Sequence, residues 1–241
     1  MYTETTEISY RDADLTNRIK VSALVALMQE VAGKDSAQYG WGWEALLAED
    51  VCFVITRLNI KMFKYPQATE KIRISSFPEG HPRLIFERGY RVETEDGELV
   101  AEANSEWVLL NFKKRSIERP TAVSLPPFPD SAMQPEVFKL EKERYIFEPE
   151  DSVKKIPLYS DYDHNRHVNN AKYIEWIEDM MPAERYDFEA IEELDIKFEQ
   201  EISVGEPVEI SWAEKDGYKF YQGKDKDGKS HFKAKVKYRR V

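Results

Sequence analysis

The sequence predicts an α+β fold of two similar units, each a long helix packed against an antiparallel sheet. The first observation is an internal repeat, because segment 10–19 aligns without a gap with segment 159–168 and shares a tyrosine and two aspartates with it. The second is size, since 241 residues exceed the usual single domain of about 100 to 150 residues. The third is composition: 41% hydrophobic and 12% aromatic residues can fill two cores.

One long helix is expected near the start of each repeat. In the first repeat, apolar residues recur at steps of three and four between Val21 and Val31, which is the spacing of an amphipathic helix. In the second, the same spacing follows Asn170 and ends near Pro182, because proline cannot continue a helix. Each helix therefore presents one apolar face to the sheet of its own unit.

Strands are expected after each helix. Segment 60–65 corresponds to segment 196–201, and segment 72–75 corresponds to segment 208–211, again without a gap. Each repeat ends in an alternating hairpin that turns at an Asp-Gly pair, at positions 96–97 and 227–228. Two such units side by side would form one continuous sheet with a cleft where the domains meet.

The domain boundaries follow from proline content. Prolines at positions 120, 126, 127, 129 and 135 fall in a stretch that can neither pair in a sheet nor continue a helix. We therefore expect a first domain at 1–120, a linker at 121–142 and a second domain at 143–241.

Charge and hydropathy exclude several classes of protein. The net charge of −10 argues against nonspecific binding of nucleic acid, which requires a basic surface. Apolar runs such as 51–55 are far too short to span a bilayer, and the first residues lack the features of a signal peptide. We therefore expect no membrane span and a cytoplasmic location.

Cysteine and histidine usage give no indication of a cofactor. Cys52 is the single cysteine, so an intramolecular disulfide is excluded, and its apolar surroundings favour an inert core thiol over a nucleophile. The four histidines do not show metal-ligand spacing, and there is no glycine-rich phosphate loop. No metal and no cofactor are expected.

The polar run before the second helix is the strongest functional signal. Asp163, Asn165 and His167 alternate, so an extended or turn segment can direct them to one side, whereas Thr16 and Arg18 stand at the last two places in the first repeat. The helix N-terminus behind them offers unpaired N–H groups and a positive dipole end. On spacing alone, capping or turn formation explains the Asp and Asn, and a structural role explains the His.

This run resembles the signature of the acyl-[acyl-carrier-protein] thioesterases, the bacterial relatives of the plant fatty-acyl thioesterases. The matching pattern is Asp163-x-Asn165-x-His167-Val168-Asn169-Asn170-x-Lys172-Tyr173-Ile174, with support from segments 27–32, 54–57 and 106–111. The resemblance covers nearly the whole chain and implies a tandem hotdog fold. It also implies hydrolysis of fatty acyl-acyl carrier protein (acyl-ACP) to free fatty acid and holo-ACP, which ends chain elongation.

The resemblance assigns catalytic roles to Asp163, Asn165, His167 and, on a later strand, Glu201. Plant members carry a cysteine beside that acid, whereas here Gln200 and Ile202 flank it, which argues against a Cys-His-Asn mechanism. Either Glu201 or Asp163 could activate water, or Glu201 could attack the thioester directly and give an anhydride. Both routes stay open. The first domain has Tyr65 in place of Glu201 and is expected to be the catalytically degenerate, acyl-pocket side.

Substrate contacts are less specific in the sequence. An acyl tunnel could be lined by Leu24, Met28, Trp41, Trp43 and Trp107, although such residues are more often simply core.

The acidic carrier protein requires a local basic patch. The possible patches are Lys113, Lys114, Arg115 and Arg119, or the alternating cations of segment 233–239, which can also be a solvated sheet face. Acyl-coenzyme A hydrolysis and non-catalytic acyl-thioester binding are the alternative functions. Monomer and homodimer both remain open.

Overall fold

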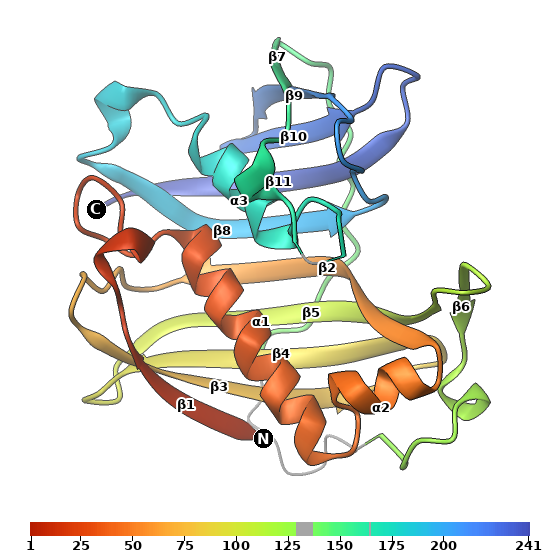
Figure 1. Cartoon of the computed structure of the whole chain (residues 1–241). Helices are drawn as coiled ribbons and strands as arrows, with labels where there is room; N and C mark the ends of the chain where they lie inside the picture. Colours follow the sequence, from red (N-terminus) through yellow and green to blue (C-terminus); the bar gives the residue numbers. More distant parts are fainter. Residues whose placement is uncertain (129–136, 164) are drawn as a thin grey trace.

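The computed structural model describes residues 1–128, 137–163 and 165–241. Its strands form one 11-stranded antiparallel sheet in the order β1-β3-β4-β5-β2-β8-β11-β10-β9-β7, with β6 paired to β5 (Figure 1). The first half contributes β1 (Tyr2–Glu7), α1 (Val21–Gln38), α2 (Trp43–Ala48), β2 (Val51–Met62), β3 (Lys71–Gly80), β4 (Ile85–Thr94), β5 (Leu99–Asn111) and β6 (Ser116–Glu118). The second half contributes β7 (Asp151–Lys155), α3 (Asn170–Glu178), β8 (Glu189–Phe198), β9 (Val208–Lys215), β10 (Tyr218–Lys224) and β11 (Ser230–Arg240).

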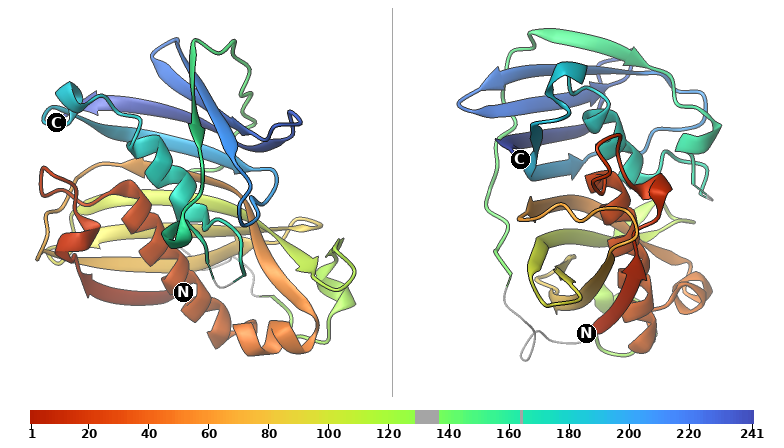
Figure 2. Two further views of the ribbon diagram at one scale, coloured as in Figure 1. Left: turned by 45° about the horizontal axis from the view of Figure 1, so that its top comes forward. Right: turned by 90° about the vertical axis from the view of Figure 1, so that its left-hand side faces the viewer.

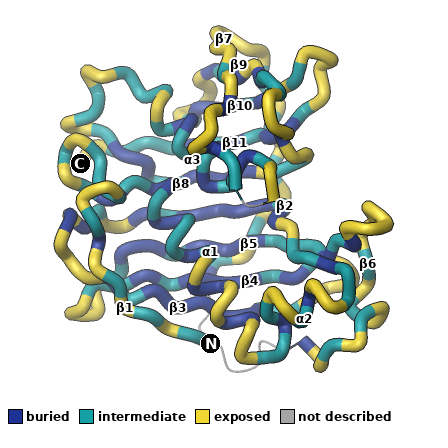
Figure 3. Tube along the Cα trace, viewed as in Figure 1, coloured by how far each residue is buried: buried dark blue, intermediate teal, exposed yellow. Residues whose placement is uncertain are grey.

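The two long helices confirm the repeat read from the sequence. Helices α1 and α3 begin at equivalent positions, Val21 and Asn170, and lie next to each other against the same face of the sheet (Figures 1 and 2). The buried positions follow the middle of the sheet and the helix faces that meet it (Figure 3). One hydrophobic core therefore extends across both halves, as residues of both belong to a single buried cluster.

The halves meet at the pairing of β2 with β8. In this antiparallel pair Asn59 lies opposite Asp195. The offset that relates Tyr65 to Glu201 also relates Asn59 to Asp195, so a residue faces its own counterpart. An approximate two-fold axis therefore passes through this pair, and it relates the two halves of the molecule.

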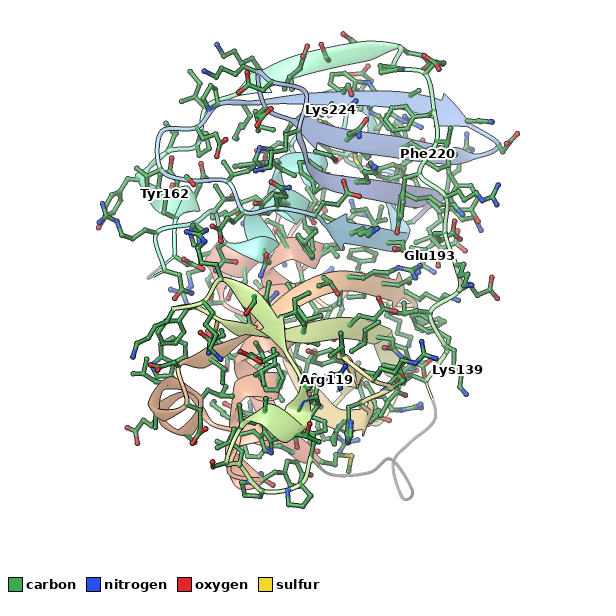
Figure 4. The ribbon with its side chains drawn as sticks, turned by 90° about the vertical axis from the view of Figure 1, so that its right-hand side faces the viewer. Arg119, Lys139, Tyr162, Glu193, Phe220 and Lys224 are labelled. Atoms are coloured by element: carbon green, nitrogen blue, oxygen red, sulfur yellow. The ribbon has the colours of Figure 1, made fainter. Side chains whose placement is uncertain are left out.

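The connector between the halves crosses the face of the sheet opposite the helices (Figure 2). Figure 4 shows Lys139 on the connector at one side of the molecule and Tyr162 at the other. The Arg57 guanidinium donates to the carbonyl oxygen of Glu141 at 2.6 Å, and the ring of Phe147 stacks on Phe220 with centroids 5.9 Å apart. Residues 129–136 of the expected linker lie outside the described residues.

The described helices also bear on the membrane question. None of them is both long enough and apolar enough to cross a bilayer.

Candidate active site

A tight loop before α3 carries the predicted polar run. The Asp163 carboxylate accepts the N–H groups of Asn165 at 2.8 Å and His167 at 3.4 Å, and the N–H of Asp163 donates to the carbonyl of His167 at 2.9 Å. Arg166 occupies the left-handed region at φ 66°, which the tight turn requires. Asp163 therefore shapes the loop through turn hydrogen bonds, while the side chain of Asn165 is exposed and that of His167 is partly exposed.

Glu201 lies beside His167. The segment after β8 passes next to the loop, because the N–H of Val168 donates to the carbonyl of Ile202 at 3.1 Å. This register brings His167 Nδ1 to 3.4 Å from one carboxylate oxygen of Glu201. Arg115 donates to the other oxygen at 3.1 Å from the loop after β5. Three residues far apart in the sequence thus form one polar cluster.

The N-terminus of α3 borders the same cluster. The side chain of Asn169 caps the helix by accepting the N–H of Ala171 at 2.9 Å, as the spacing allowed. Asn170, the first residue of the helix, contributes to the wall of the adjoining cavity. The positive end of the helix dipole is therefore close to the place where a thioester carbonyl could be polarised.

The polar cluster stands at one end of a cavity of about 1130 Å³. Asp163, Asn165, His167 and Glu201 all line it, so the fold brings the four predicted catalytic residues to one space. Most of the remaining wall comes from the first half of the chain, and it is rich in apolar and aromatic side chains. Its aromatic members include Trp41, Trp43, Phe53, Phe86, Trp107 and Phe128.

The predicted tunnel residues separate into two groups. Trp41, Trp43 and Trp107 line the cavity. Leu24 and Met28 do not appear in its wall; they are 0% and 1% exposed and belong to the main core. The periodicity of α1 marks its buried face correctly, but it cannot distinguish contact with the sheet from contact with a cavity.

An aromatic cluster closes one part of the cavity. The ring of Trp41 contacts Phe53, Phe86 and Phe128 at centroid distances of 5.8, 5.7 and 5.4 Å. Its indole N–H donates to the carbonyl of Pro126 at 2.9 Å, so the polar edge of the ring is satisfied. The cluster forms a second, smaller hydrophobic core in the first half.

Cys52 lies in the cavity wall rather than in the core. It is partly buried on β2, and burial together with the nearby charge of Glu201 raises the pKa of its thiol. A raised pKa keeps sulfur protonated, whereas a nucleophilic cysteine needs a lowered one. The expected inert character fits these surroundings, although the expected location in the core is wrong.

Gln29 is a site residue that the sequence analysis missed. It lines the cavity, and among the described residues its buried Nε2 has no hydrogen-bond partner. The helix alignment places Gln29 at the position of Glu178, which accepts the N–H groups of Val21 at 2.7 Å and Ser22 at 3.3 Å at the start of α1. By the same two-fold relation, Gln29 faces the start of α3. The internal repeat could therefore have identified Gln29 from the sequence, through its alignment with Glu178.

Comparison with known proteins decides the family. The profile of the acyl-ACP thioesterase N-terminal domain matches residues 1–122, and that of the acyl-ACP thioesterase C-terminal domain matches residues 148–240. The chain belongs to the acyl-ACP thioesterase family. Curated relatives include oleoyl-acyl carrier protein thioesterase 2, chloroplastic, of Arabidopsis thaliana, 25% identical over 78% of the chain and 56% of the relative. Palmitoyl-acyl carrier protein thioesterase, chloroplastic, of Cuphea hookeriana is 25% identical over 71% of the chain and 43% of the relative. The chain thus spans about half the length of the curated relatives it matches.

Solved structures show the fold of this family member. An acyl-ACP thioesterase from Bacteroides thetaiotaomicron aligns with a TM-score of 0.81 at 23% identity, over 98% of this chain and 96% of that one. The 12:0-ACP thioesterase from Umbellularia californica aligns with a TM-score of 0.80 at 18% identity, over 100% and 97%. The predicted α+β tandem hotdog fold is therefore confirmed.

Proposed function

We propose that this protein hydrolyses the thioester of fatty acyl-ACP and releases free fatty acid and holo-ACP. The observation that carries the proposal is the contact of His167 with Glu201 at the polar end of an aromatic cavity. Thioester hydrolysis requires an activated nucleophile, a group that polarises the carbonyl, and an apolar space for the acyl tail. The arrangement supplies all three within one cavity.

In the water-mediated route, Glu201 acts as general base. It removes a proton from water as the water oxygen attacks the thioester carbonyl carbon, and the C–S bond breaks when the tetrahedral intermediate collapses. The proton is then passed to the leaving sulfur, so that free fatty acid and thiol result. His167 orients the carboxylate from 3.4 Å, and the exposed amide of Asn165 orients the water or the carbonyl.

In the nucleophilic route, a carboxylate oxygen of Glu201 attacks the carbonyl carbon and the thiol leaves. The resulting mixed anhydride is then hydrolysed by water, which regenerates the carboxylate. Single turnover in ¹⁸O-labelled water tests for the anhydride, because the water-mediated route never places label in Glu201. Attack of water on the side-chain carbon of the anhydride would place label in Glu201.

The oxyanion of the intermediate requires hydrogen-bond donors. The first turn of α3 and the Gln29 side chain border the cavity from opposite helices, and among the described residues the buried Nε2 of Gln29 has no hydrogen-bond partner. Donors placed in advance at a developing negative charge are typically worth about 3 to 4 kcal/mol in an enzyme site. We assign the oxyanion site to this corner of the cavity.

Local charges favour one of the two candidate docking patches for the acidic carrier protein. The cations of β11 are largely committed to acidic neighbours. Lys233, Lys235 and Lys237 pair with Glu199, Glu143 and Glu192 at 3.3, 3.1 and 3.0 Å.

The cations of the loop after β5 are more exposed than those of β11. The side chains of Lys113 and Lys114 are 68% and 69% exposed, and Arg115 at the cavity is 81% exposed. The surface ion pairs of Lys113 with Asp50 and of Lys114 with Glu118 cost little to break in favour of ion pairs with a partner protein. We place carrier-protein docking on this loop.

The decisive experiment measures thiol release from matched acyl-ACP and acyl-coenzyme A substrates of several chain lengths. We expect preferential cleavage of the carrier-bound substrates and at least a hundredfold loss of rate in Asn165→Ala and His167→Ala. Thr16→Ala, at the counterpart of Asn165 in the first half, is the matched control and should keep the rate. Preference for coenzyme A would redirect the proposal, and no cleavage of either substrate would leave acyl-thioester binding as the function.

A further inference from the structure

A buried histidine and two carboxylates gather next to the candidate active site, and one of the carboxylates, Glu206, also lines its cavity. His231 is the second residue of β11, Asp225 lies in the turn between β10 and β11, and Glu206 lies in the segment after β8. His231 Nε2 is 3.9 Å from one oxygen of Glu206 and 3.9 Å from one oxygen of Asp225. The potential ligand atoms of all three residues lie within 4.8 Å of one another. The spacing of histidines in the sequence gives no sign of this cluster, because the fold assembles it from two loops and a strand.

The imidazole of His231 is oriented with its lone pair toward the carboxylates. Its Nδ1 lies 3.1 Å from the carbonyl oxygen of Glu201 and 3.3 Å from that of Gln200. Carbonyl oxygens only accept hydrogen bonds, so Nδ1 carries a proton and the neutral ring has its lone pair on Nε2. The side chain is 1% exposed, and among the described residues Nε2 has no hydrogen-bond partner.

Both carboxylates are also held in place by their second oxygen. One oxygen of Asp225 accepts the N–H groups of Asp227 at 2.8 Å and Lys229 at 2.9 Å, and the other oxygen faces His231. One oxygen of Glu206 accepts the N–H of Ser203 at 3.0 Å, and the other faces His231. Ligands fixed by a second set of hydrogen bonds are typical of metal centres.

We propose that Glu206, Asp225 and His231 bind a divalent transition-metal cation, for which Zn²⁺ is the reference. One imidazole nitrogen and two carboxylate oxygens are a donor set that such ions accept, with water as a further ligand on the partly exposed Glu206 side. Metal–ligand bonds of about 2.0 to 2.1 Å at tetrahedral angles separate donor atoms by roughly 3.4 Å. The observed 3.9 Å therefore closes with a small movement of the two carboxylates.

A cation here also resolves the charges. Two carboxylates directed at a lone pair repel it and each other, and a dication neutralises both. The rival explanation is a protonated His231 that forms a buried ion triad with the same two acids. The two explanations differ in whether metal is bound, so one binding experiment separates them.

The metal would anchor the segment that carries Glu201. The His231 ring that binds the cation through Nε2 also holds the backbone carbonyls of Gln200 and Glu201 through Nδ1. Glu206 ties the end of the same segment to the cluster. Binding would therefore fasten residues 200–206 to the hairpin of β10 and β11.

Calorimetric titration of the chelator-treated full chain with ZnCl₂ tests the proposal, with MgCl₂ as the hard-ion comparison. We expect one Zn²⁺ per chain, little response to Mg²⁺, and a Zn²⁺-dependent rise in Tm. Asp225→Asn and Glu206→Gln should weaken Zn²⁺ binding at least tenfold, whereas the matched control Asp227→Asn should bind like wild type. These carboxamide variants preserve the backbone hydrogen bonds, so they stay informative where a His231 variant fails to fold.

Two results would overturn the proposal. Wild type that binds no Zn²⁺ would identify the cluster as an ion triad with a protonated histidine. Zn²⁺ binding that both carboxamide variants retain unchanged would place the metal elsewhere on the surface. Since neither readout uses thioester hydrolysis, the outcome does not depend on the proposed function.

Discussion

The two loops that precede α1 and α3 share one backbone design and differ in their chemistry. In the first loop Asp14 accepts the N–H groups of Thr16 at 2.8 Å and Arg18 at 3.1 Å, and its own N–H donates to the carbonyl of Arg18 at 2.7 Å. Asp163 makes the equivalent set in the second loop, and the residues at the turn, Asn17 and Arg166, both have φ 66°. The aspartate is therefore a scaffold feature of both halves.

The two halves differ in a pair of residues: His167 and Glu201 in the second half stand where Arg18 and Tyr65 stand in the first. In the second half His167 contacts Glu201 at a cavity. At the equivalent places in the first half, the Arg18 guanidinium lies 5.9 Å from the ring centroid of Tyr65, and both side chains reach across to the second half. Arg18 donates to the carbonyl of Tyr186 at 2.5 Å, and the Tyr65 hydroxyl donates to that of Ile191 at 2.6 Å. One copy of the site became an interface, and the other kept access to a cavity.

The strongest test of this comparison substitutes the acid, Glu201, in one variant and its counterpart, Tyr65, in another. Glu201→Gln should lower kcat at least a hundredfold, because an amide neither accepts a proton nor attacks the carbonyl. Tyr65→Phe should keep kcat and lose about 1 kcal/mol of unfolding free energy with its hydrogen bond. Thiol-release kinetics and urea unfolding measure the two effects. Comparable activity losses in both variants would show that the halves are not functionally distinct.

A second prediction concerns Glu178, which accepts hydrogen bonds from the N-terminus of α1, and it makes the unfolding free energy depend on pH. Burial raises the pKa of Glu178 to about 7, against its hydrogen bonds from the N-terminus of α1. Between pH 4.5 and 7 the folded state then binds more protons than the unfolded state, so unfolding free energy falls as pH rises and levels off above pH 7. Over that window the loss is on the order of 3 kcal/mol. Glu178→Gln has no such loss.

Urea unfolding at several pH values measures this effect. We expect the unfolding free energy of Glu178→Gln to rise steadily relative to that of wild type as pH increases from 4.5 to 7. Glu79 also has a pKa raised by burial to about 7, and it contributes equally to both proteins, so it cancels in the difference. A difference that stays constant with pH would contradict the assignment.

A further test uses Gln29 on α1, the counterpart of Glu178 on α3. Gln29→Ala removes an amide donor from the proposed oxyanion corner and should lower kcat roughly tenfold or more with little change in KM, as expected for contacts made in the transition state. Gln29→Glu should be more harmful, because it places negative charge beside the developing oxyanion. Parallel changes in kcat and KM for the Ala variant would instead indicate a role in binding.

The smallest expected effect concerns docking. Lys113→Ala with Lys114→Ala should raise KM for acyl-ACP a few fold and weaken its dependence on salt, because exposed charges act mainly on encounter. Lys233→Ala on β11 is the control and should leave KM unchanged. If only the β11 variant raised KM, docking would belong to that strand.

Local patterns in the sequence predicted much of the fold. The helices begin where the repeat placed them, and both Asp-Gly hairpins form, with Gly97 at φ 83° and Gly228 at φ 80°. These glycines supply the left-handed conformation that their turns need. The alternation along β11 also separates its lysines from buried Phe232, Ala234 and Val236.

Contacts set by tertiary packing were not predictable in the same way. The cavity wall combines α1, β2 and the loop before α3, so periodicity alone could not place Met28 in the core and Cys52 at the cavity. The pairing of Arg115 with Glu201, and the meeting of Glu206 with His231, depend on loops whose paths no short-range pattern specifies.

The central strand pair determines which partners each half can accept. Across the two-fold axis Arg57 forms a two-pronged ion pair with buried Asp195 at 3.0 and 2.6 Å, and Asn59 donates to Glu193 at 3.0 Å. Two copies of the second half would bring four carboxylates together there, and two copies of the first would leave both arginines without the Asp195 carboxylate. Pairing either half with a second copy of itself would leave buried charges without their partners, which costs several kcal/mol. Separated halves would thus select each other over copies of themselves.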